Sequence, residues 1–301
     1  MSIIVSGPPG AAPGLYGDGN QSGVTFDGTS VVAGLTPAAN VYTMVADIHT
    51  GALTNNVAST IKPQGFIIHV DGDLNNAGSI NSDGLPAVAS VAGAAIAATG
   101  TLQTVGGAGG AGRNTTGAGS AATGAGGRNV SGSGGGAGGT GGGPNTGGAG
   151  NTTAFPTAIQ GTARSLQMVM RGRLKDNTSF NGSGGGGGGG VTLNTGTAIS
   201  GGGGSAAVAM IIFCRRLNNT GTISCKGGAG ANATGTGDAN GGGGGGGAGG
   251  YLAIVTQEII SLGTVSVDGG IQGTGFGLGA NGVPGTKGLG LIFLPNSTII
   301  L

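Results

Sequence analysis

The sequence has few of the residues with which globular proteins fill a core or bind polyanions. Tryptophan is absent, aromatic residues make up 3% of the chain and charged residues 7% of its 301 residues. Few aromatic side chains leave little bulky apolar material for a conventional core. The 11 Lys and Arg residues stand against 10 Asp and Glu, a formal net charge of +1. Because neutralising phosphates requires clustered cations, we expect no nucleic acid partner.

Cysteine and long apolar runs are equally scarce. Cys214 and Cys225 are too few for the disulfide framework of a secreted domain this size, so we expect two small buried thiols. No run of about 18 apolar residues is present, which argues against a membrane-spanning helix. Residues 1–9 lack the basic segment of a signal peptide. Synthesis and assembly in a cytoplasm are therefore expected.

Side chains for catalysis are sparse as well. Glu258 is the single glutamate, and His49 and His69 lack a recognisable Ser–Asp or Cys partner. Hydrolysis of glycans uses two positioned carboxylates, which disfavours a β-helical depolymerase. The spacing of Asp71 and Asp73 suits a cation, but capping of a turn is the preferred interpretation. We expect no enzyme, no cofactor and no metal site.

Glycine is what the chain has in abundance, with 78 residues. Glycine loses more backbone entropy on folding than any other residue, so a chain this rich in it needs an unusual source of stability. Two structures are open for tracts such as 106–150 and 241–250: flexible coil, or packed polyproline-II-like helices that supply one another's hydrogen-bond partners. Strict collagen spacing is missing, which excludes a collagen triple helix.

A strand-turn-strand unit recurs along the chain at a fixed register. One copy surrounds Leu217, and the next places Ile259 at the equivalent position, 42 residues later. A third copy places Leu74 at the position equivalent to Leu217, and a degenerate fourth copy is expected at 166–184. A period of this size is typical of a unit that buries its face only against a neighbour. We predict an all-β fold of repeated strand-turn-strand units, solenoid- or sandwich-like, with glycine-rich polyglycine-II helical layers.

Composition divides the chain into three parts. These are a Pro/Gly-rich N-terminal arm at 1–20, a β region with the first repeat at 21–100, and a glycine-rich repeat region with polyglycine-II layers at 101–301. The Ala/Val-rich stretch 87–98 fits a helix or a buried strand of small residues. The apolar segment 289–301 is expected to pair as a closing strand or to lie in an oligomer interface.

Three stretches resemble glycine-rich virion proteins of tailed bacteriophages: LYGDG at 15–19, GFIIHV at 65–70 and LNNAGSI at 74–80. The glycine tracts are similar to the polyglycine-II sandwich of T-even-like phage tail-fibre adhesins, in which packed glycine helices hold up receptor-binding loops. The resemblance implies a virion structural protein with other virion proteins as partners. A tail-fibre or tail-tip adhesin that binds a host-surface glycan or outer-membrane protein is preferred over a capsid decoration or head-fibre protein.

The candidate receptor-binding residues are aromatics and arginines expected in loops: Tyr16, Arg113, Arg128, Phe155, Phe180 and Phe276. For the aromatics, packing inside the fold is the stronger alternative. An extracellular ice-binding or matrix protein is the alternative from a different class. Strict Gly-x-x triplets, an export signal and bridging cysteines would favour it, and the sequence is interpreted as lacking all three. The apolar C-terminus and the end repeats that a solenoid must cap predict a homo-oligomer, with a trimer as the expected state.

Overall fold

The computed structural model describes residues 22–33, 35–97, 100, 102, 105–116, 121–122, 132–133, 135–141, 181–182, 185, 188, 190–295 and 297–301. These residues form strands, turns and extended segments, with no helix among them, which confirms the all-β prediction for this part of the chain. No helical segment of the described chain has the length and hydropathy needed to cross a bilayer. The N-terminal arm at 1–20 lies outside the described residues.

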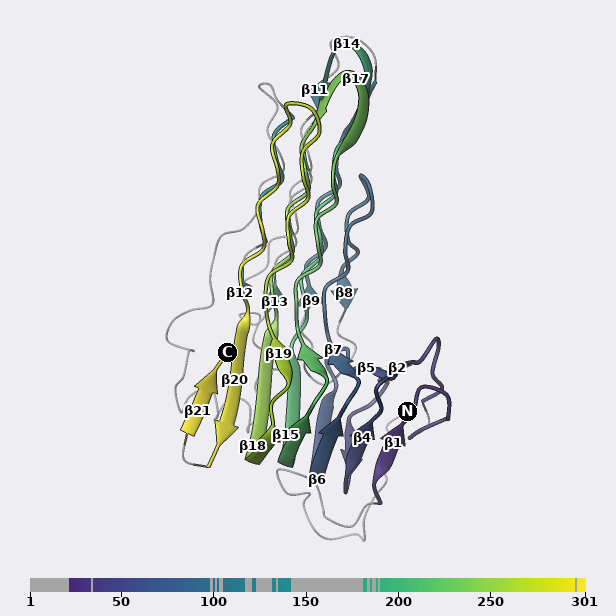
Figure 1. Cartoon of the computed structure of the whole chain (residues 1–301), viewed down its shortest axis with the longest axis vertical. Coiled ribbons are helices and arrows are strands. Elements are labelled where there is room, and N and C mark those ends of the chain that lie inside the picture. Colours follow the sequence, from purple (N-terminus) through teal and green to yellow (C-terminus); the bar gives the residue numbers. More distant parts are fainter. Residues whose placement is uncertain are drawn as a thin grey trace.

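The base of the molecule is built on an eight-stranded, largely parallel sheet (Figure 1). Its long strands lie side by side in the order β6 (Ile67–Asn76), β15 (Met210–Asn219), β18 (Tyr251–Ser261) and β20 (Leu289–Leu294). On its other side β6 pairs with β3 (Ile48–Thr50) and β4 (Leu53–Asn55), and β4 pairs in turn with β1 (Val24–Phe26) at the edge. At the other edge β21 (Ser297–Ile300) pairs antiparallel with β20. The apolar C-terminus is therefore a closing strand.

A second sheet of five short parallel strands completes the base. Its order is β19 (Thr264–Ser266), β16 (Thr222–Ser224), β7 (Ser79–Asn81), β5 (Thr60–Lys62) and β2 (Val41–Thr43). Three of these strands follow a long strand after two residues, the second of which is Gly78, Gly221 or Gly263. A Cβ atom on Gly221 would lie 2.1 Å from the carbonyl oxygen of Gly78 in the next copy. Stacked turns therefore require glycine at this position.

The predicted register of the repeats is the register of the sheet at Leu217. Leu217 pairs with Ile259 on one side and with Leu74 on the other, which confirms the period of 42 residues and the third copy. Parallel pairing of equal units places equivalent residues opposite one another. The degenerate fourth copy predicted at 166–184 falls almost wholly outside the described residues.

The core of the base lies between the long and the short strands. Leu74, Leu217, Ile80 and Ile223 are fully buried there, and each apolar side chain contributes roughly 1.5–3 kcal/mol relative to an exposed one. Cys214 and Cys225 belong to the same core as free thiols, which confirms the sequence-based expectation.

A row of buried asparagines crosses this core. The Asn55 side-chain amide donates to Asn76 Oδ1 and the Asn76 amide donates to Asn219 Oδ1, both at 2.7 Å. The Asn219 amide in turn donates to the Leu262 carbonyl oxygen. Because a buried amide without partners is costly, the row holds neighbouring strands in register.

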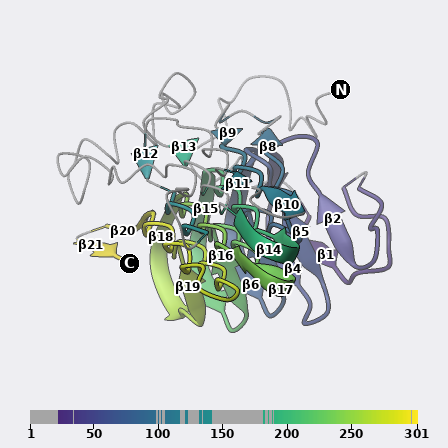
Figure 2. The same cartoon turned by 90° about the horizontal axis from the view of Figure 1, so that it is seen from above.

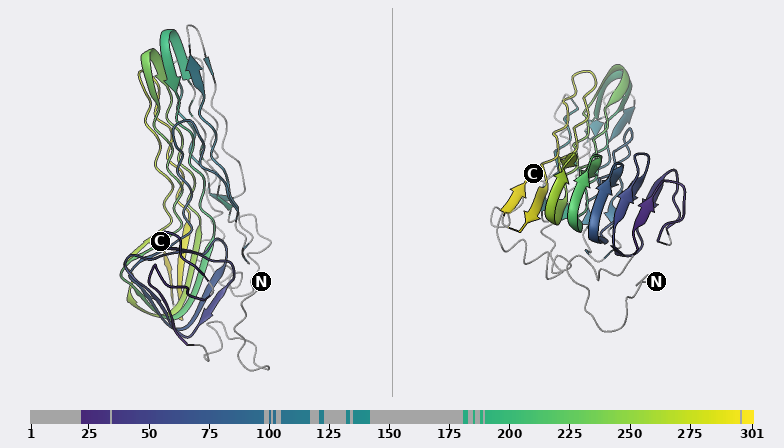
Figure 3. Two further views of the ribbon diagram at one scale, coloured as in Figure 1. Left: turned by 90° about the vertical axis from the view of Figure 1, so that its right-hand side faces the viewer. Right: turned by 60° about the horizontal axis from the view of Figure 1, so that its bottom comes forward.

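Glycine-rich extended segments rise from the base and form a narrow bundle, which we call the shaft (Figures 1 and 3). Along 201–208, eight consecutive N–H groups donate to three neighbouring segments in strict rotation, with N···O distances of 2.7–3.2 Å. Every third residue from Gly201 donates to 242–248, the next residue to 82–89 and the one after to 107–110. All eight donors thereby find partners outside their own segment, so this tract is not loose coil.

The packing of the shaft explains where glycine is required. Residues 242–250 are buried throughout, and a Cβ atom on Gly244 would lie 1.9 Å from the Gly202 carbonyl oxygen. Outward positions accept other residues, such as Asp268, Ile271 and Thr274 at every third place of one segment.

Two sequence interpretations are corrected by the shaft. Gly279, Gly282, Gly285 and Gly288 stand at strict intervals of three, and a Cβ on each would overlap a neighbouring carbonyl oxygen, so strict Gly-x-x triplets are present at the last segment. The described part of the Ala/Val-rich stretch, 87–97, is neither helix nor buried strand. It forms an exposed turn closed by a Val88–Val91 bridge, an extended segment and the short strand β8 (Ile96–Ala97). That strand joins β9 (Val105–Gly106), β13 (Asn181–Gly182) and β12 (Gly132–Ser133) in a small sheet.

Candidate recognition surface

The end of the shaft farthest from the base carries a four-stranded sheet, which we call the tip sheet (Figures 1 and 2). Its central strand β14 (Gly190–Ile199) pairs antiparallel with β17 (Thr234–Gly241) on one side. On the other side it pairs with β10 (Asn114–Thr116) and β11 (Ala121–Ala122). The C-terminus lies at the base, and the tip sheet lies at the opposite end of the molecule (Figure 1).

Two glycines shape the interior of the central strand pair. Gly196 pairs with Gly237 after a register shift, and their φ angles are +113° and +64°. Only glycine adopts such backbone angles without strain. A Cβ on Gly196 would also lie 2.0 Å from the Thr236 carbonyl oxygen. The two strands therefore approach closely at this glycine pair.

The tip sheet presents hydroxyl and amide groups with little charge. Thr195, Thr236, Asn114 and Thr116 are exposed. Asp238 is the single charged residue within 190–199 and 232–241, and its Oδ1 accepts a hydrogen bond of 2.9 Å from the Thr195 N–H. Such groups donate and accept hydrogen bonds without a strong field of either sign. The surface suits a polar, uncharged ligand.

A turn at 276–279 lies beside β17 and adds an apolar contact. Phe276 and Gly241 exchange backbone hydrogen bonds of 2.7 and 3.1 Å. The Phe276 ring is half-buried and lies so close to Gly235 that a Cβ there would meet it at 2.7 Å. Leu278 is 79% exposed, and its N–H donates to Asn240 Oδ1 at 2.6 Å. The asparagine thus holds a turn that presents leucine to solvent.

Of the six predicted receptor-binding residues, two lie in the described chain. Arg113 is exposed, directly precedes β10, and donates its backbone N–H to the Gly188 carbonyl oxygen at 3.2 Å. Phe276 lies beyond β17, so β14 and β17 separate the two residues. The other four candidates, Tyr16, Arg128, Phe155 and Phe180, lie outside the described residues. Leu278 and the threonines of the tip were not among the predicted residues, although Thr-Gly-Thr occurs at both 195–197 and 234–236.

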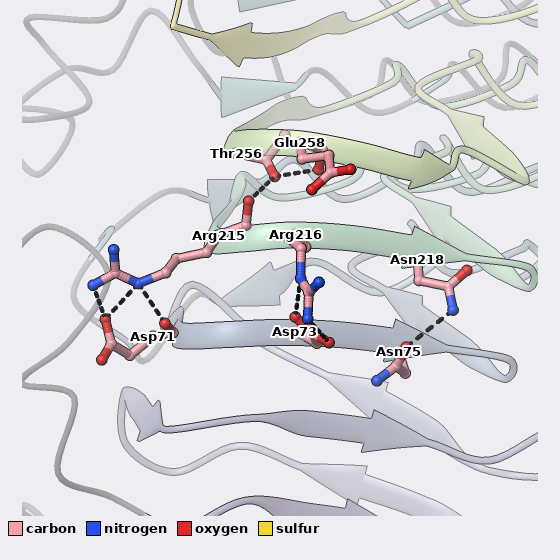
Figure 4. Close-up of polar contacts among 8 residues, drawn as sticks. All are labelled: Asp71, Asp73, Asn75, Arg215, Arg216, Asn218, Thr256 and Glu258. Carbon is pink, nitrogen blue, oxygen red and sulfur yellow. Dashed lines mark hydrogen bonds and ion pairs between the residues drawn. The ribbon is translucent and has the colours of Figure 1, made fainter.

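The aspartate pair singled out in the sequence has a structural partner instead (Figure 4). Arg215 contacts Asp71 Oδ1 through Nη2 at 2.6 Å, and Arg216 Nε lies 2.6 Å from Asp73 Oδ1. Both aspartates lie within β6 and both arginines within β15, so the turn-capping interpretation is wrong. Ion pairs this exposed contribute at most about 1 kcal/mol each and serve mainly to match neighbouring strands.

The base offers little reactivity. Burial raises the pKa of the Cys214 thiol to about 12, and burial also raises the pKa of Cys225 well above its usual value. A thiol reacts as the thiolate, so both side chains are inert at neutral pH. Within the described residues, no group of three or more His, Cys, Asp and Glu side chains is placed to hold a metal ion. His49 and His69 stack at 4.4 Å between ring centroids, and His69 stacks on Phe213 at 4.9 Å.

Comparison with known proteins adds no assignment to this geometry. No protein-family model, no curated protein and no solved structure matches the chain.

Proposed function

We propose that the chain is a structural protein of a tailed-bacteriophage virion, a tail-fibre or tail-tip adhesin whose polyglycine-II shaft holds a recognition surface away from the particle. The observation that carries this proposal is the rotation of hydrogen bonds along 201–208 through three neighbouring segments. A return to the same neighbour every third residue, without bonds inside the segment, matches a helix of three residues per turn. The resemblance of 65–80 to phage virion proteins supplies the biological setting.

A stiff shaft suits presentation of a binding surface. A nine-residue segment such as 201–209 spans roughly 28 Å at the rise of a polyproline-II-type helix. Because its backbone is bonded sideways to several segments, bending it requires breaking hydrogen bonds in more than one direction. Loops held on a rigid scaffold lose little entropy when they bind.

The chemistry of the tip favours recognition without reaction. Hydroxyl and amide groups of the tip sheet would bind a host-surface glycan or an outer-membrane protein by shape and hydrogen bonds, and Leu278 would supply apolar contact. A capsid decoration or head-fibre protein remains the alternative within the virion. The ice-binding alternative is disfavoured because one outward row mixes Asp268, Ile271 and Thr274 instead of repeating one small residue.

Cell binding tests the proposal. The biotin-tagged full chain is incubated with bacteria from a host panel, and bound protein is measured by flow cytometry together with competition against adsorption of the phage. Leu278→Asp replaces a tip side chain that is 79% exposed, and Ile271→Asp is the matched control on the shaft, 70% exposed. We expect saturable binding that Leu278→Asp weakens about tenfold, or by about 1.4 kcal/mol, and that the control retains.

Three outcomes contradict parts of this interpretation. Folded protein that binds no cell would exclude the adhesin and favour the capsid alternative. Equal binding with Leu278→Asp and Thr236→Arg combined would exclude recognition by the tip. Light scattering that shows a stable monomer would contradict the homotrimer expected from the sequence.

A further inference from the structure

A pocket of about 220 Å³ opens where the base meets the shaft, separate from the tip sheet. Lys62 and Asn81 reach it from the ends of β5 and β7, and Asp83 lies at the start of the segment that rises from β7. Val208, the last but one residue before β15, contributes from a descending segment. The pocket thus collects side chains from both sheets' connections to the shaft.

The polar side chains of the pocket are positioned but not saturated. Asp83 Oδ2 accepts from the Ser224 hydroxyl at 2.9 Å, and its Oδ1 accepts from the Lys226 N–H at 2.6 Å. Each carboxylate oxygen has a further lone pair available to a ligand. Within the described residues, no hydrogen bond or ion pair engages the Lys62 ammonium or the Gln64 side-chain amide.

The remaining wall is aliphatic. Leu85, Ile96 and Val208 line it, and Ser82 lies among them with a buried hydroxyl that has no hydrogen-bond partner in the described chain. A buried hydroxyl without a partner costs roughly 1–3 kcal/mol, which a ligand hydroxyl would recover. The pocket therefore has one apolar wall and one wall of unsaturated donors and acceptors.

We propose that this pocket binds a single monosaccharide unit of a surface glycan. A pyranose ring has an apolar face of C–H groups and an edge of hydroxyls that both donate and accept. Lys62 donates, Asp83 accepts, and the amides of Gln64 and Asn81 do both, so adjacent hydroxyls find complementary partners. The volume lies below the range of pockets for drug-sized ligands, which limits the occupant to one ring. The glycan source rests on the proposed adhesin function, whereas saccharide binding itself does not.

Methyl NMR of the full chain tests the site directly, because the lining includes one leucine, one isoleucine and one valine. Glucose, galactose, mannose, rhamnose and N-acetylglucosamine are titrated into protein labelled at Ile, Leu and Val methyls. We expect one or more sugars to shift the signals of Leu85, Ile96 and Val208 together, with a Kd of about 1–10 mM. Ala95→Phe, which fills the pocket from its exposed rim, and Lys62→Met, which removes the cation, should each weaken binding about tenfold or more.

The controls separate this inference from the adhesin proposal. Leu278→Asp at the tip should leave the methyl shifts unchanged, and methyl signals of the core confirm that each variant is folded. Sugar binding without cell binding would support the pocket and contradict the adhesin proposal. Cell binding without methyl shifts would support the adhesin proposal and contradict the pocket. The inference is overturned if no sugar shifts the three signals at about 50 mM, if the shifts survive Ala95→Phe, or if only free amino acids produce them.

Discussion

The substitution Gly244→Ala tests the packing of the shaft most directly. Gly244 lies in the buried segment 242–250, donates its N–H to the Ala231 carbonyl oxygen at 3.0 Å, and accepts from the Gly273 N–H at 2.8 Å. An alanine Cβ would lie 1.9 Å from the Gly202 carbonyl oxygen, whereas non-bonded carbon and oxygen atoms need about 3 Å or more. The segment 201–204 must therefore move away by roughly 1 Å.

The cost follows from the bonds that this movement breaks. Gly201 and Gly204 donate to Gly242 and Gly245 at 3.0 Å each, on either side of the substituted residue. Two buried hydrogen bonds left unmade cost roughly 2–6 kcal/mol. Replacing glycine by alanine also stabilises by about 0.4–1 kcal/mol, because the unfolded chain loses entropy. The steric effect is the larger of the two. We therefore expect the free energy of unfolding to fall by about 3 kcal/mol and the Tm to fall by about 6–10 °C.

Three Gly→Ala variants measured by thermal denaturation give a graded series. The nearest atom to the added Cβ is a backbone oxygen at 1.9 Å for Gly244, a side-chain carbon at 3.1 Å for Gly241 and a side-chain carbon at 3.3 Å for Gly23. We expect the loss of Tm to fall in that order, with Gly23→Ala within about 0.5 kcal/mol of the parent protein. Equal or higher stability of Gly244→Ala would refute the reasoning, because a loosely packed shaft would gain from alanine.

Three further expectations concern the base. Asn76→Ala removes one hydrogen bond from the buried amide on each side, so urea denaturation should show a loss of roughly 2–4 kcal/mol. Cys214 and Cys225 should not react with Ellman's reagent at pH 8 until guanidinium unfolds the chain, because burial raises both pKa values and blocks access. Hydrogen bonds from the backbone N–H and hydroxyl of Ser30, and others nearby, lower the pKa of Asp27. Its contribution to stability is therefore present above about pH 3.9 and lost as the pH falls further, so Asp27→Asn should destabilise less at pH 3 than at pH 7.

The register of the base was predictable because parallel strands align equal residues, and Leu217 pairs with Ile259 as the period requires. Aligning Leu74 with Leu217 also places Asp71 opposite Cys214, but the structure pairs Cys214 with Val70. The sheet register shifts between Cys214 and Arg216, where β6 has one residue more than β15. The buried residues record this β-bulge, because the last two core residues are Val70 and Leu74 on β6 but Cys214 and Leu217 on β15. Alignment of the copies on the leucine and glycine alone does not reveal it.

The neighbours within the shaft could not be predicted in the same way. Every glycine tract presents the same backbone, so nothing local indicates that 201–208 should contact 82–89, 107–110 and 242–248 together. The tip could not be predicted from the sequence either. Its threonines follow no apolar period, and Leu278 is one exposed leucine among glycines. Aromatics and arginines do not mark this part of the tip, since surfaces made of hydroxyls and backbone turns leave little compositional signal.

The threefold rotation of hydrogen bonds also dictates how this architecture lengthens or widens. Three residues added to one segment raise its end by about 9 Å and preserve every lateral partner only if adjoining segments gain three as well. One or two added residues would turn each following donor toward the wrong neighbour. An additional 42-residue copy, by contrast, adds a strand at the base and two segments beside the existing ones, so the bundle broadens while the tip keeps its height. The length and the width of the shaft are thus controlled by separate kinds of insertion.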